Sequence, residues 1–386
     1  MIPYGKQNIN QADIDSVVNV LQSEFLTQGP QVPLFEKTVS EYCGVKYGVA
    51  VNSATSALHI ACLALGLGEG DYFWTSPNTF VASANCGLYC GAKVDFVDID
   101  SKTYNLSTKE LEKKLIQAKQ DNKLPKIVIP VHFAGQSCDM KKIHSLSQEY
   151  GFKIIEDASH AIGGKYLDQS IGCCQYSDIT VFSFHPVKII TTAEGGLATT
   201  NNKELSEHMQ LFRSHGVTRD PKLMIKKAEG GWHYQQVELG FNYRMTELQA
   251  ALGVSQMKRL DEFVALRHQR QKRYDELLKN LPVVVPYQDM DSYSALHLYP
   301  IQIKTDKVKN TRKEIFEALR KNDIGVNVHY IPVHTQPYYE NIGFKKGCYP
   351  NAEAYYDSAI SIPLFSQMSV IQQDMVVKNL KKIFNI

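Results

Sequence analysis

The sequence predicts an α/β protein, with a large domain built on a mostly parallel sheet and a smaller α+β domain after it. Three observations predict this class. Short apolar runs and amphipathic stretches alternate along the first two-thirds of the 386 residues. This alternation is typical of βαβ units and a parallel sheet. Beyond residue 240 the alternation stops, and a long helical pattern without proline begins.

Seven apolar runs predict the strands of the large sheet. They lie at 47–52, 71–76, 93–99, 126–133, 152–158, 179–184 and 196–200. Apolar residues recur at helical spacing in Thr55–Leu67, Thr108–Gln120 and Asp139–Tyr150, which predicts helices between the strands. Asp220–Gln236 is polar and contains glycine, which indicates a mobile loop or an insertion.

The second domain is expected to begin with one long helix over Thr246–Asn280, which ends before Pro282 because proline stops helices. Apolar runs at 297–303 and 325–331 follow, with a helix between them over Thr311–Lys321. The last ~25 residues have helical periodicity again. We therefore expect residues 1–245 to form the N-terminal segment and large domain, and residues 246–386 to form the connecting helix and small domain.

Composition excludes several classes of function. The formal net charge is +2 without a basic stripe, which argues against nucleic acid as a partner. No apolar run reaches the ~18 residues of a membrane span, and the N-terminus does not resemble a signal peptide. The eight cysteines are scattered, without the spacing of a metal site. These features predict a cytoplasmic protein with reduced thiols, no metal and no membrane partner.

Three local patterns could carry chemistry. Asn52–Leu58 places small hydroxyl residues where the first strand ends and a helix begins, and the free N–H groups of a helix start can bind phosphate. An ordinary helix cap would give the same pattern. Asp157 ends the apolar run 152–158, at the sheet edge where open α/β sheets bind ligands. A solvated acid at a strand end is the alternative.

The third pattern is the most specific. Lys188 follows the run 179–184 in a stretch of small, uncharged residues, and Gly195-Gly196 come soon after it. Loss of solvation there would lower the pKa of the lysine and free its amine to attack a carbonyl. The alternative is a surface lysine with a buried stem. A phosphate cradle, Asp157 and Lys188 together are what pyridoxal 5'-phosphate requires: a phosphate anchor, an acid on the pyridine nitrogen and a Schiff-base lysine.

At this point the chain resembles the sugar aminotransferases of the DegT/DnrJ/EryC1/StrS family, which have the type I aspartate-aminotransferase fold. The resemblance covers nearly the whole chain. It rests on LTQGP (26–30), NSATSALHIA (52–61), EDASHAIGG (156–164), SFHPVKIITTAEGG (183–196), FRSHG (212–216), LGFNYRMTELQAALG (239–253), HLYP (297–300), VHYIPVH (328–334) and AISIPLF (359–365).

Within the family, SFHPVKIITTAEGG and VHYIPVH look most like UDP-sugar 4-aminotransferases of pseudaminic acid biosynthesis. The implied acceptor is UDP-2-acetamido-2,6-dideoxy-β-L-arabino-hexos-4-ulose, and the implied amino donor is L-glutamate. Pyridoxamine 5'-phosphate is the implied intermediate form of the cofactor. A homodimer with shared active sites is also implied.

The resemblance implies roles for individual residues. Lys188 matches the Schiff-base lysine and the proton carrier, and Asp157 matches the partner of the pyridine nitrogen. His160 sits where a side chain contacts the phenolic oxygen of the cofactor, and Phe80 where an aromatic ring stacks on the pyridine, although a core phenylalanine is the alternative. The implied phosphate ligands are Ala54, Thr55, Ser183 and Asn242, of which Asn242 would reach the cofactor of the neighbouring subunit.

The matching segments also imply a sugar-nucleotide cleft. Its expected residues are Thr27, Gln28, His185, Arg213, His329, Tyr330 and His334. Arg213 could form a charge-assisted fork on the diphosphate, or it could be a helix-surface arginine. Among the aromatic residues of this set, Tyr330 is preferred over the histidines as a substrate contact.

Other functions stay open to different degrees. A 4-aminotransferase for perosamine or 4-amino-arabinose would share the same catalytic residues. A sugar dehydratase of the same fold is disfavoured because those relatives replace the lysine with histidine. A non-catalytic regulatory protein that binds the cofactor is disfavoured, because such a protein would not need the complete set of catalytic residues. A dinucleotide oxidoreductase is disfavoured because no GxGxxG follows the first strand.

Overall fold

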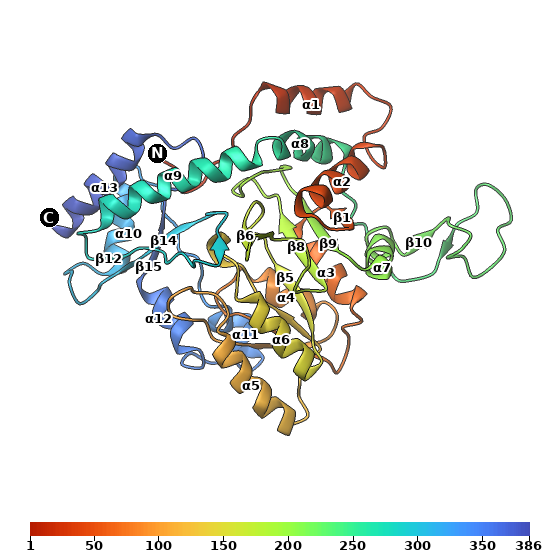
Figure 1. Cartoon of the computed structure of the whole chain (residues 1–386), viewed down its shortest axis with the longest axis horizontal. Coiled ribbons are helices and arrows are strands. Elements are labelled where there is room, and N and C mark those ends of the chain that lie inside the picture. Colours follow the sequence, from red (N-terminus) through yellow and green to blue (C-terminus); the bar gives the residue numbers. More distant parts are fainter.

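A computed structural model describes all residues from 1 to 386, and its centre is a seven-stranded sheet (Figure 1). The strands are β1 (Tyr47–Val51), β2 (Tyr72–Thr75), β3 (Lys93–Phe96), β4 (Ile127–Ile129), β5 (Lys153–Asp157), β8 (Ile179–Ser183) and β9 (Gly196–Thr200). Their order in the sheet is β1-β9-β8-β5-β4-β2-β3. All seven predicted strands are confirmed, and so is the mostly parallel α/β class. Only β9 runs antiparallel to its neighbours, β1 and β8.

Helices cover both faces of this sheet. On one face lie α3 (Ala54–Ala64), α4 (Ala82–Leu88) and α7 (Lys203–Arg213), and on the other α2 (Gln31–Cys43), α5 (Thr108–Gln120) and α6 (Met140–Tyr150). Successive strand residues point to opposite faces, so Val181 joins the core under α3 whereas Phe182 joins the core under α2. The large domain therefore has three layers with a core on each side of the sheet.

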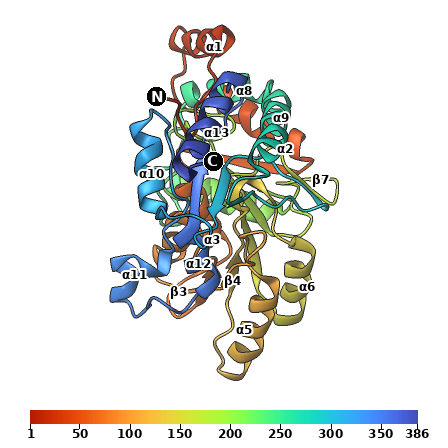
Figure 2. The same cartoon turned by 90° about the vertical axis from the view of Figure 1, so that its left-hand side faces the viewer.

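The C-terminal domain has its own core around a three-stranded antiparallel sheet. Its strands are β12 (Val283–Val284), β14 (Tyr299–Ile303) and β15 (Ala359–Ile362), in the order β12-β14-β15. Figure 2 shows α10 (Arg312–Lys321) and α13 (Val370–Phe384) beside this sheet. Ile315 and Leu380 of these helices join the same apolar cluster as Ile301 of β14. The helices predicted at 311–321 and at the C-terminus are both present.

The predicted single helix over Thr246–Asn280 was wrong. The structure has α8 (Glu247–Met257) and α9 (Leu260–Leu278), and a break between them at Lys258 and Arg259. Arg259 donates hydrogen bonds to Asp13 and to Asn8, which ties the break to the N-terminal segment. α8 packs on α2 and on α1 (Gln11–Leu21), so the chain changes from one domain to the other along α9.

The apolar run at 325–331 does not form a strand either. It makes one bridge, between Asn327 and Ser361, and the sheet is completed by β15 instead. The side-chain oxygen of Asn327 accepts the N–H of Val328, so this N–H is bonded locally rather than to a neighbouring strand. The short helices α11 (Pro337–Asn341) and α12 (Pro350–Ser358) follow before β15.

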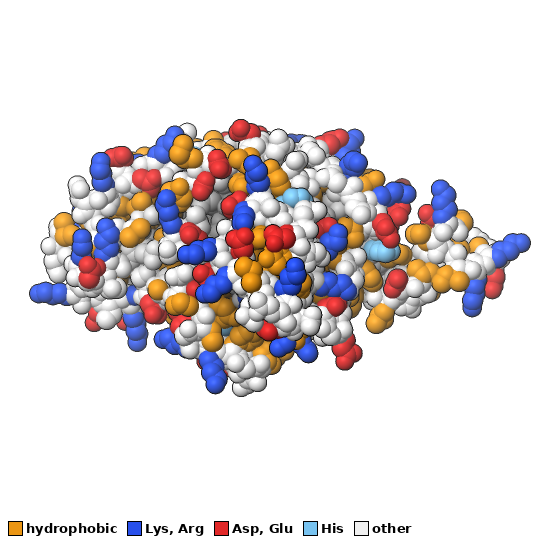
Figure 3. All heavy atoms as spheres, turned by 60° about the horizontal axis from the view of Figure 1, so that its bottom comes forward, with side chains coloured by type: hydrophobic (Ala, Val, Ile, Leu, Met, Phe, Trp, Pro, Cys, Tyr) orange, Lys and Arg blue, Asp and Glu red, His pale blue; other side chains and the backbone are white.

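The remaining strands form two small sheets. β6 (Lys165–Tyr166), β7 (Gln169–Ser170) and β13 (Ser292–Tyr293) form one of them. β10 (Val217–Thr218) pairs with β11 (Gln235–Gln236) at the base of a long arm that projects from the body (Figures 1 and 3). The insertion predicted over Asp220–Gln236 corresponds to this arm, which exposes Ile225 and Trp232. None of the helices combines the length and the apolar character that crossing a bilayer requires.

Candidate active site

A cavity of about 1000 Å³ lies at the carboxyl edge of the large sheet, between the two domains. It is bounded by the start of α3, the ends of β5 and β8, and the segment 327–330 of the C-terminal domain. Ten of the predicted site residues line it: Ala54, Thr55, Phe80, Asp157, His160, Ser183, His185, Lys188, His329 and Tyr330. The topology thus brings the three predicted chemical patterns to one place.

The start of α3 forms the phosphate side of the cavity. Ser53 caps the helix and accepts the N–H of Ser56 at 3.1 Å, while the N–H groups of Ala54 and Thr55 have no carbonyl partner within the helix. A side chain at Gly196 would meet the nitrogen of Ala54 at 2.5 Å. Glycine therefore lets β9 begin directly beside the helix start, where the dipole and the N–H groups favour an anion.

Lys188 lies on a turn after β8 and lines the same cavity as Asp157. Burial lowers the pKa of its ammonium group to about 8, and the nearby Asp157 carboxylate acts in the opposite direction. A lysine with this pKa is partly neutral near pH 8, which is the form that reacts with an aldehyde. The structure therefore gives Lys188 the environment that its sequence context predicts.

Asp157 ends β5 and is held through both carboxylate oxygens. Its Oδ1 accepts the N–H of Ser159 at 3.1 Å, and its Oδ2 accepts the hydroxyl of Ser83 at 2.6 Å. Sequence reasoning missed Ser83, because it lies on α4, far from Asp157 in the chain. The position of α4 directly after Phe80 is the one signal that could have indicated it.

Three of the histidines that line the cavity, His160, His297 and His329, are buried and neutral. Burial, with smaller effects of the Lys188 charge and of His329, holds the pKa of His160 well below its usual range, and burial with Lys188 lowers that of His329 to about 3. The Nδ1 of His160 accepts the N–H of Ala134 at 3.3 Å, so its proton is on Nε2, which is 3.0 Å from the hydroxyl oxygen of Tyr330. The predicted contact of His160 with the phenolic oxygen of the cofactor would use this same Nε2–H.

Phe80 and the lining of the C-terminal domain complete the cavity. The ring of Phe80 is 60% exposed although it is large and apolar, and it lies 6.4 Å from the ring of Tyr330. A surface of this kind is suited to cover a flat ring. Tyr4 and Asn327 also line the cavity and were not predicted. Tyr4 reaches it because the N-terminal segment lies against the C-terminal domain, which no local pattern indicates.

Two predicted substrate residues lie elsewhere. Arg213 points away from the cavity, where its guanidinium pairs with the carboxylate of Glu36 and donates to the carbonyl of Ala50. His334 is fully buried, and its Nε2 lies 2.9 Å from Glu353. Both side chains are already used in contacts that hold the fold together. Neither residue lines the cavity, and the diphosphate fork of Arg213 and the substrate contact of His334 stay predictions.

Thr27, Gln28 and Asn242 are also outside the cavity lining. Thr27 and Gln28 are exposed in the loop between α1 and α2, and Asn242 is exposed beside its bridge partner Ser214. Asn242 is expected to act on a neighbouring subunit, so its role stays a prediction, as do the roles of Thr27 and Gln28.

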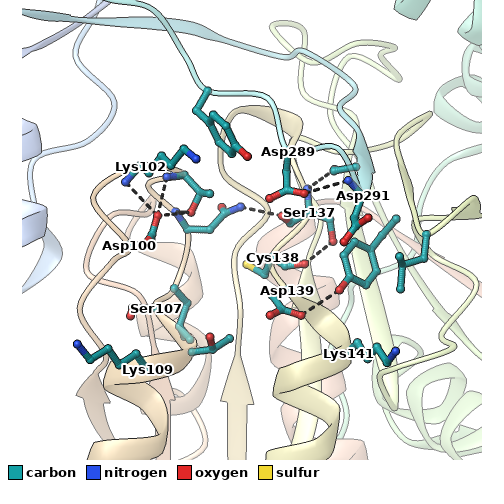
Figure 4. Close-up of a pocket in the computed structure, with 18 residues that line it drawn as sticks. Asp100, Lys102, Ser107, Lys109, Ser137, Cys138, Asp139, Lys141, Asp289 and Asp291 are labelled. Atoms are coloured by element: carbon teal, nitrogen blue, oxygen red, sulfur yellow. Dashed lines mark hydrogen bonds between the residues drawn. The ribbon is translucent and has the colours of Figure 1, made fainter.

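A second, smaller cavity of about 480 Å³ lies near the starts of α5 and α6 (Figure 4). Its wall mixes lysines with aspartates, among them Lys102, Lys141 and Asp139. Asp139 caps α6 and accepts the hydroxyl of Tyr166, and Lys102 lies over the ring of Tyr287. None of the predicted site residues lines it, so the predicted chemistry belongs to the larger cavity alone.

Known proteins resemble this chain along nearly its whole length. UDP-4-amino-4,6-dideoxy-N-acetyl-beta-L-altrosamine transaminase of Campylobacter jejuni serotype O:2 is 39% identical over 372 residues, which are 96% of this chain and 94% of that protein. PseC of Helicobacter pylori, an aminotransferase involved in the biosynthesis of pseudoaminic acid, has a TM-score of 0.91 at 32% identity, covering 100% of this chain and 99% of that one.

A further solved structure is Spr1654 of Streptococcus pneumoniae in its PLP form. Its TM-score is 0.89 at 28% identity, and the match covers 100% of this chain and 98% of that one. The model of the DegT/DnrJ/EryC1/StrS aminotransferase family matches residues 7–381. Because this match spans nearly the whole sequence, the chain belongs to the DegT/DnrJ/EryC1/StrS aminotransferase family.

Proposed function

We propose that this protein is a pyridoxal-phosphate-dependent transaminase for a UDP-linked 4-keto-6-deoxy-N-acetylhexosamine. It would move the amino group of L-glutamate to C4 of that sugar, as in the pseudaminic acid pathway. The observation that carries the proposal is that Lys188, Asp157 and the start of α3 line one cavity, with Asp157 close enough to Lys188 for its charge to act on the pKa of the lysine. The relatives named for this sugar and pathway support the choice of substrate.

The residues of the cavity fit the cofactor. Ala54 and Thr55 offer unpaired N–H groups to its phosphate, and Ser183 lines the same wall. Phe80 presents an uncovered aromatic face to its ring. The carboxylate of Asp157 would accept a hydrogen bond from the protonated pyridine nitrogen, and Lys188 would bond the aldehyde carbon. Bound pyridoxal phosphate supplies the electron sink for the pair released at the carbon that loses a proton.

Side chains of the cavity would carry the protons that the reaction moves. The amine of Lys188, whose pKa burial lowers to about 8, would take a proton from the donor's α-carbon as a general base and give it back as a general acid. The three neutral histidines around the cavity add no positive charge next to this amine. Tyr330 donates no proton to His160, so its hydroxyl remains available to a substrate oxygen.

The active unit is proposed to be a homodimer with shared sites. Asn242 is exposed and lies at the base of the arm that carries the exposed Ile225 and Trp232. A second copy of the chain would cover this apolar surface and would receive Asn242 beside its cofactor phosphate. A dimer in solution that dissociates when Trp232 is changed to Lys would support this arrangement.

A second candidate is a 4-aminotransferase for another nucleotide sugar, of the perosamine or 4-amino-arabinose type. The catalytic residues would be identical, and only the sugar and nucleotide contacts would differ. A panel of acceptors therefore separates the two candidates, because a preference for one acceptor depends on the contacts that differ.

The deciding experiment is to record the visible spectrum of the purified holoenzyme during each half-reaction. Glutamate should remove the band of the lysine-linked cofactor, and one 4-keto nucleotide sugar should restore it. Lys188→Ala should lack this band and turn over no substrate, whereas Lys126→Ala, at the opposite edge of the sheet, should behave as the wild type. A band that responds to glutamate but to no UDP-linked 4-keto sugar would reject the proposed acceptor. An active Lys188→Ala protein would reject the mechanism.

A further inference from the structure

We propose that Ser83 is a positioning residue that keeps the proton on the pyridine nitrogen of the cofactor by holding Asp157 as a carboxylate. Ser83 lies on α4, is fully buried and does not line the cavity, so it would act through Asp157 alone. The inference rests on the proposed use of pyridoxal phosphate and adds a residue that none of the three chemical patterns contains.

The direction of each hydrogen bond around Ser83 can be assigned. Its hydroxyl has one proton and three possible acceptors: the Oδ2 of Asp157 at 2.6 Å, the Oγ1 of Thr79 at 2.7 Å and the carbonyl of Phe80 at 3.4 Å. The carboxylate is nearer and charged, so it takes the proton. Thr79 Oγ1 lies 2.7 Å from the Ser83 oxygen and must therefore be the donor of that bond. A chain of donors runs from Thr79, in the cavity wall, through Ser83 to Asp157.

The carboxylate of Asp157 still has room for the cofactor. Its Oδ1 accepts one bond from the Ser159 N–H, its Oδ2 accepts one from Ser83, and a carboxylate offers about four acceptor positions. Asp157 lines the cavity, so free positions are available to a pyridinium N–H.

The proton between Asp157 and the pyridine nitrogen belongs to whichever group is more basic. Burial favours a neutral carboxylic acid, whereas hydrogen bonds to the anion favour the carboxylate. The Ser83 hydroxyl donates to the carboxylate form of Asp157 and stabilises it, so the proton stays on the nitrogen. Without this bond, the proton would shift toward Asp157, and the ring would lose the positive charge that draws electrons from the substrate carbon.

The segment 79–83 also positions Phe80, whose ring would stack on the pyridine ring of the cofactor. Phe80 is three residues before Ser83, and the N–H of Ser83 donates to the carbonyl of Phe80 at 3.3 Å. The segment 79–83 thus joins the stacking contact to the nitrogen contact. A shift of α4 would change both at once, which is why a conservative change of the hydroxyl alone is the sharper test.

The test uses holoenzyme loaded with pyridoxal phosphate that carries nitrogen-15 in its ring. Ser83→Ala should keep the visible band of the lysine-linked cofactor but move the nitrogen-15 resonance toward the position of an unprotonated pyridine. Conversion by glutamate should slow about tenfold, the effect of losing a hydrogen bond to a charged group. Ser255→Ala is the matched control, because Ser255 also donates a 2.6 Å bond to a buried aspartate, Asp13, away from the cavity.

Each outcome decides a different question. A wild-type resonance in a folded Ser83→Ala holoenzyme would overturn the role of Ser83. A wild-type protein without a lysine-linked band would contradict the proposed function itself. If Ser83→Ala does not fold, Thr79→Val removes the donor to Ser83 and should give a smaller shift in the same direction. An unchanged resonance in Thr79→Val would then overturn the proposal.

Discussion

The Nε2–H of His160 donates to the hydroxyl oxygen of Tyr330 across 3.0 Å, and this bond joins the two domains at the cavity. His160 follows the end of β5 in the large domain, whereas Tyr330 belongs to the segment before α11 in the small one. Because His160 is the donor of this bond, the hydroxyl proton of Tyr330 is not used in it and is free to bond a ligand.

Tyr330→Phe should therefore weaken use of the keto sugar more than use of glutamate. Loss of one hydrogen bond is worth about 1 kcal/mol, which corresponds to roughly a fivefold lower kcat/KM for the sugar. Steady-state kinetics with each substrate varied would measure it. Tyr355→Phe is the control, because the Tyr355 hydroxyl is buried without a partner and its removal costs no hydrogen bond. Equal losses for both substrates would contradict a sugar contact.

The loading of the apoprotein with pyridoxal phosphate should depend on pH through Lys188. The pKa of Lys188 is lowered from 10.5 to about 8, so its neutral, reactive fraction rises with pH and levels off above about 8. Because the folded state binds this proton less tightly than the unfolded state, apoprotein stability should also rise between about pH 8 and pH 10.5.

Stopped-flow absorbance and pH-dependent unfolding would measure the two effects, with Lys188→Met as the reference for stability. A loading rate that keeps rising steeply to pH 10 would show that Lys188 has an ordinary pKa.

Gly196→Ala should weaken cofactor binding without unfolding the protein. The added Cβ would lie 2.5 Å from the backbone of Ser53 and Ala54, so either β9 or the start of α3 must move. Such overpacking costs about 1–3 kcal/mol, so we expect a Kd for pyridoxal phosphate that is higher by roughly fivefold to 150-fold. Fluorescence titration of the apoprotein would measure this. In Gly231→Ala the new Cβ meets no atom within 4 Å, so its Kd should equal that of the wild type.

Arg213→Met should lower stability rather than change substrate affinity. Arg213 is the ion-pair partner of Glu36, whose carboxylate also accepts the N–H of Ala50, and both side chains are largely buried. Removing the arginine leaves a buried charge without its partner, at a cost of about 3 kcal/mol. Chemical denaturation would measure the loss.

Adding Glu36→Gln to Arg213→Met should recover part of that stability, because it removes the unpaired charge. If KM for the nucleotide sugar rises strongly in this double variant while its fold is intact, the diphosphate contact expected from the sequence would be supported.

The large domain could be predicted well because its signals are local. Each of the seven strands is a short apolar run next to a helix or loop signal, and the ends of the runs carry Asp157 and Ser183. Lys188 was recognisable because a lysine in an uncharged stretch is unusual. These patterns need no knowledge of which strands are neighbours.

What the sequence could not show depends on contacts between distant segments. The break before α9 involves Asp13 and Asn8, and the run at 325–331 became irregular because Asn327 bonds its own neighbour. Arg213 and His334 were predicted to contact the substrate because both are polar and lie in characteristic segments. Glu36 lies 177 residues before Arg213 in the chain, and Glu353 lies 19 residues after His334. Only the fold brings each pair together.

The reversed direction of β9 has a consequence for how the cofactor site is built. Since β9 runs antiparallel to β8, the chain returns at the same sheet edge, and Gly196 pairs with both Ser183 and Val51. A parallel β9 would need a crossover, and its first residue would lie at the opposite edge. The loop 184–195 that carries Lys188 is therefore anchored at both ends beside the phosphate cradle. A change in the length of this loop would move the amine of Lys188. It would leave the phosphate cradle in place, because both ends of the loop are held by the sheet.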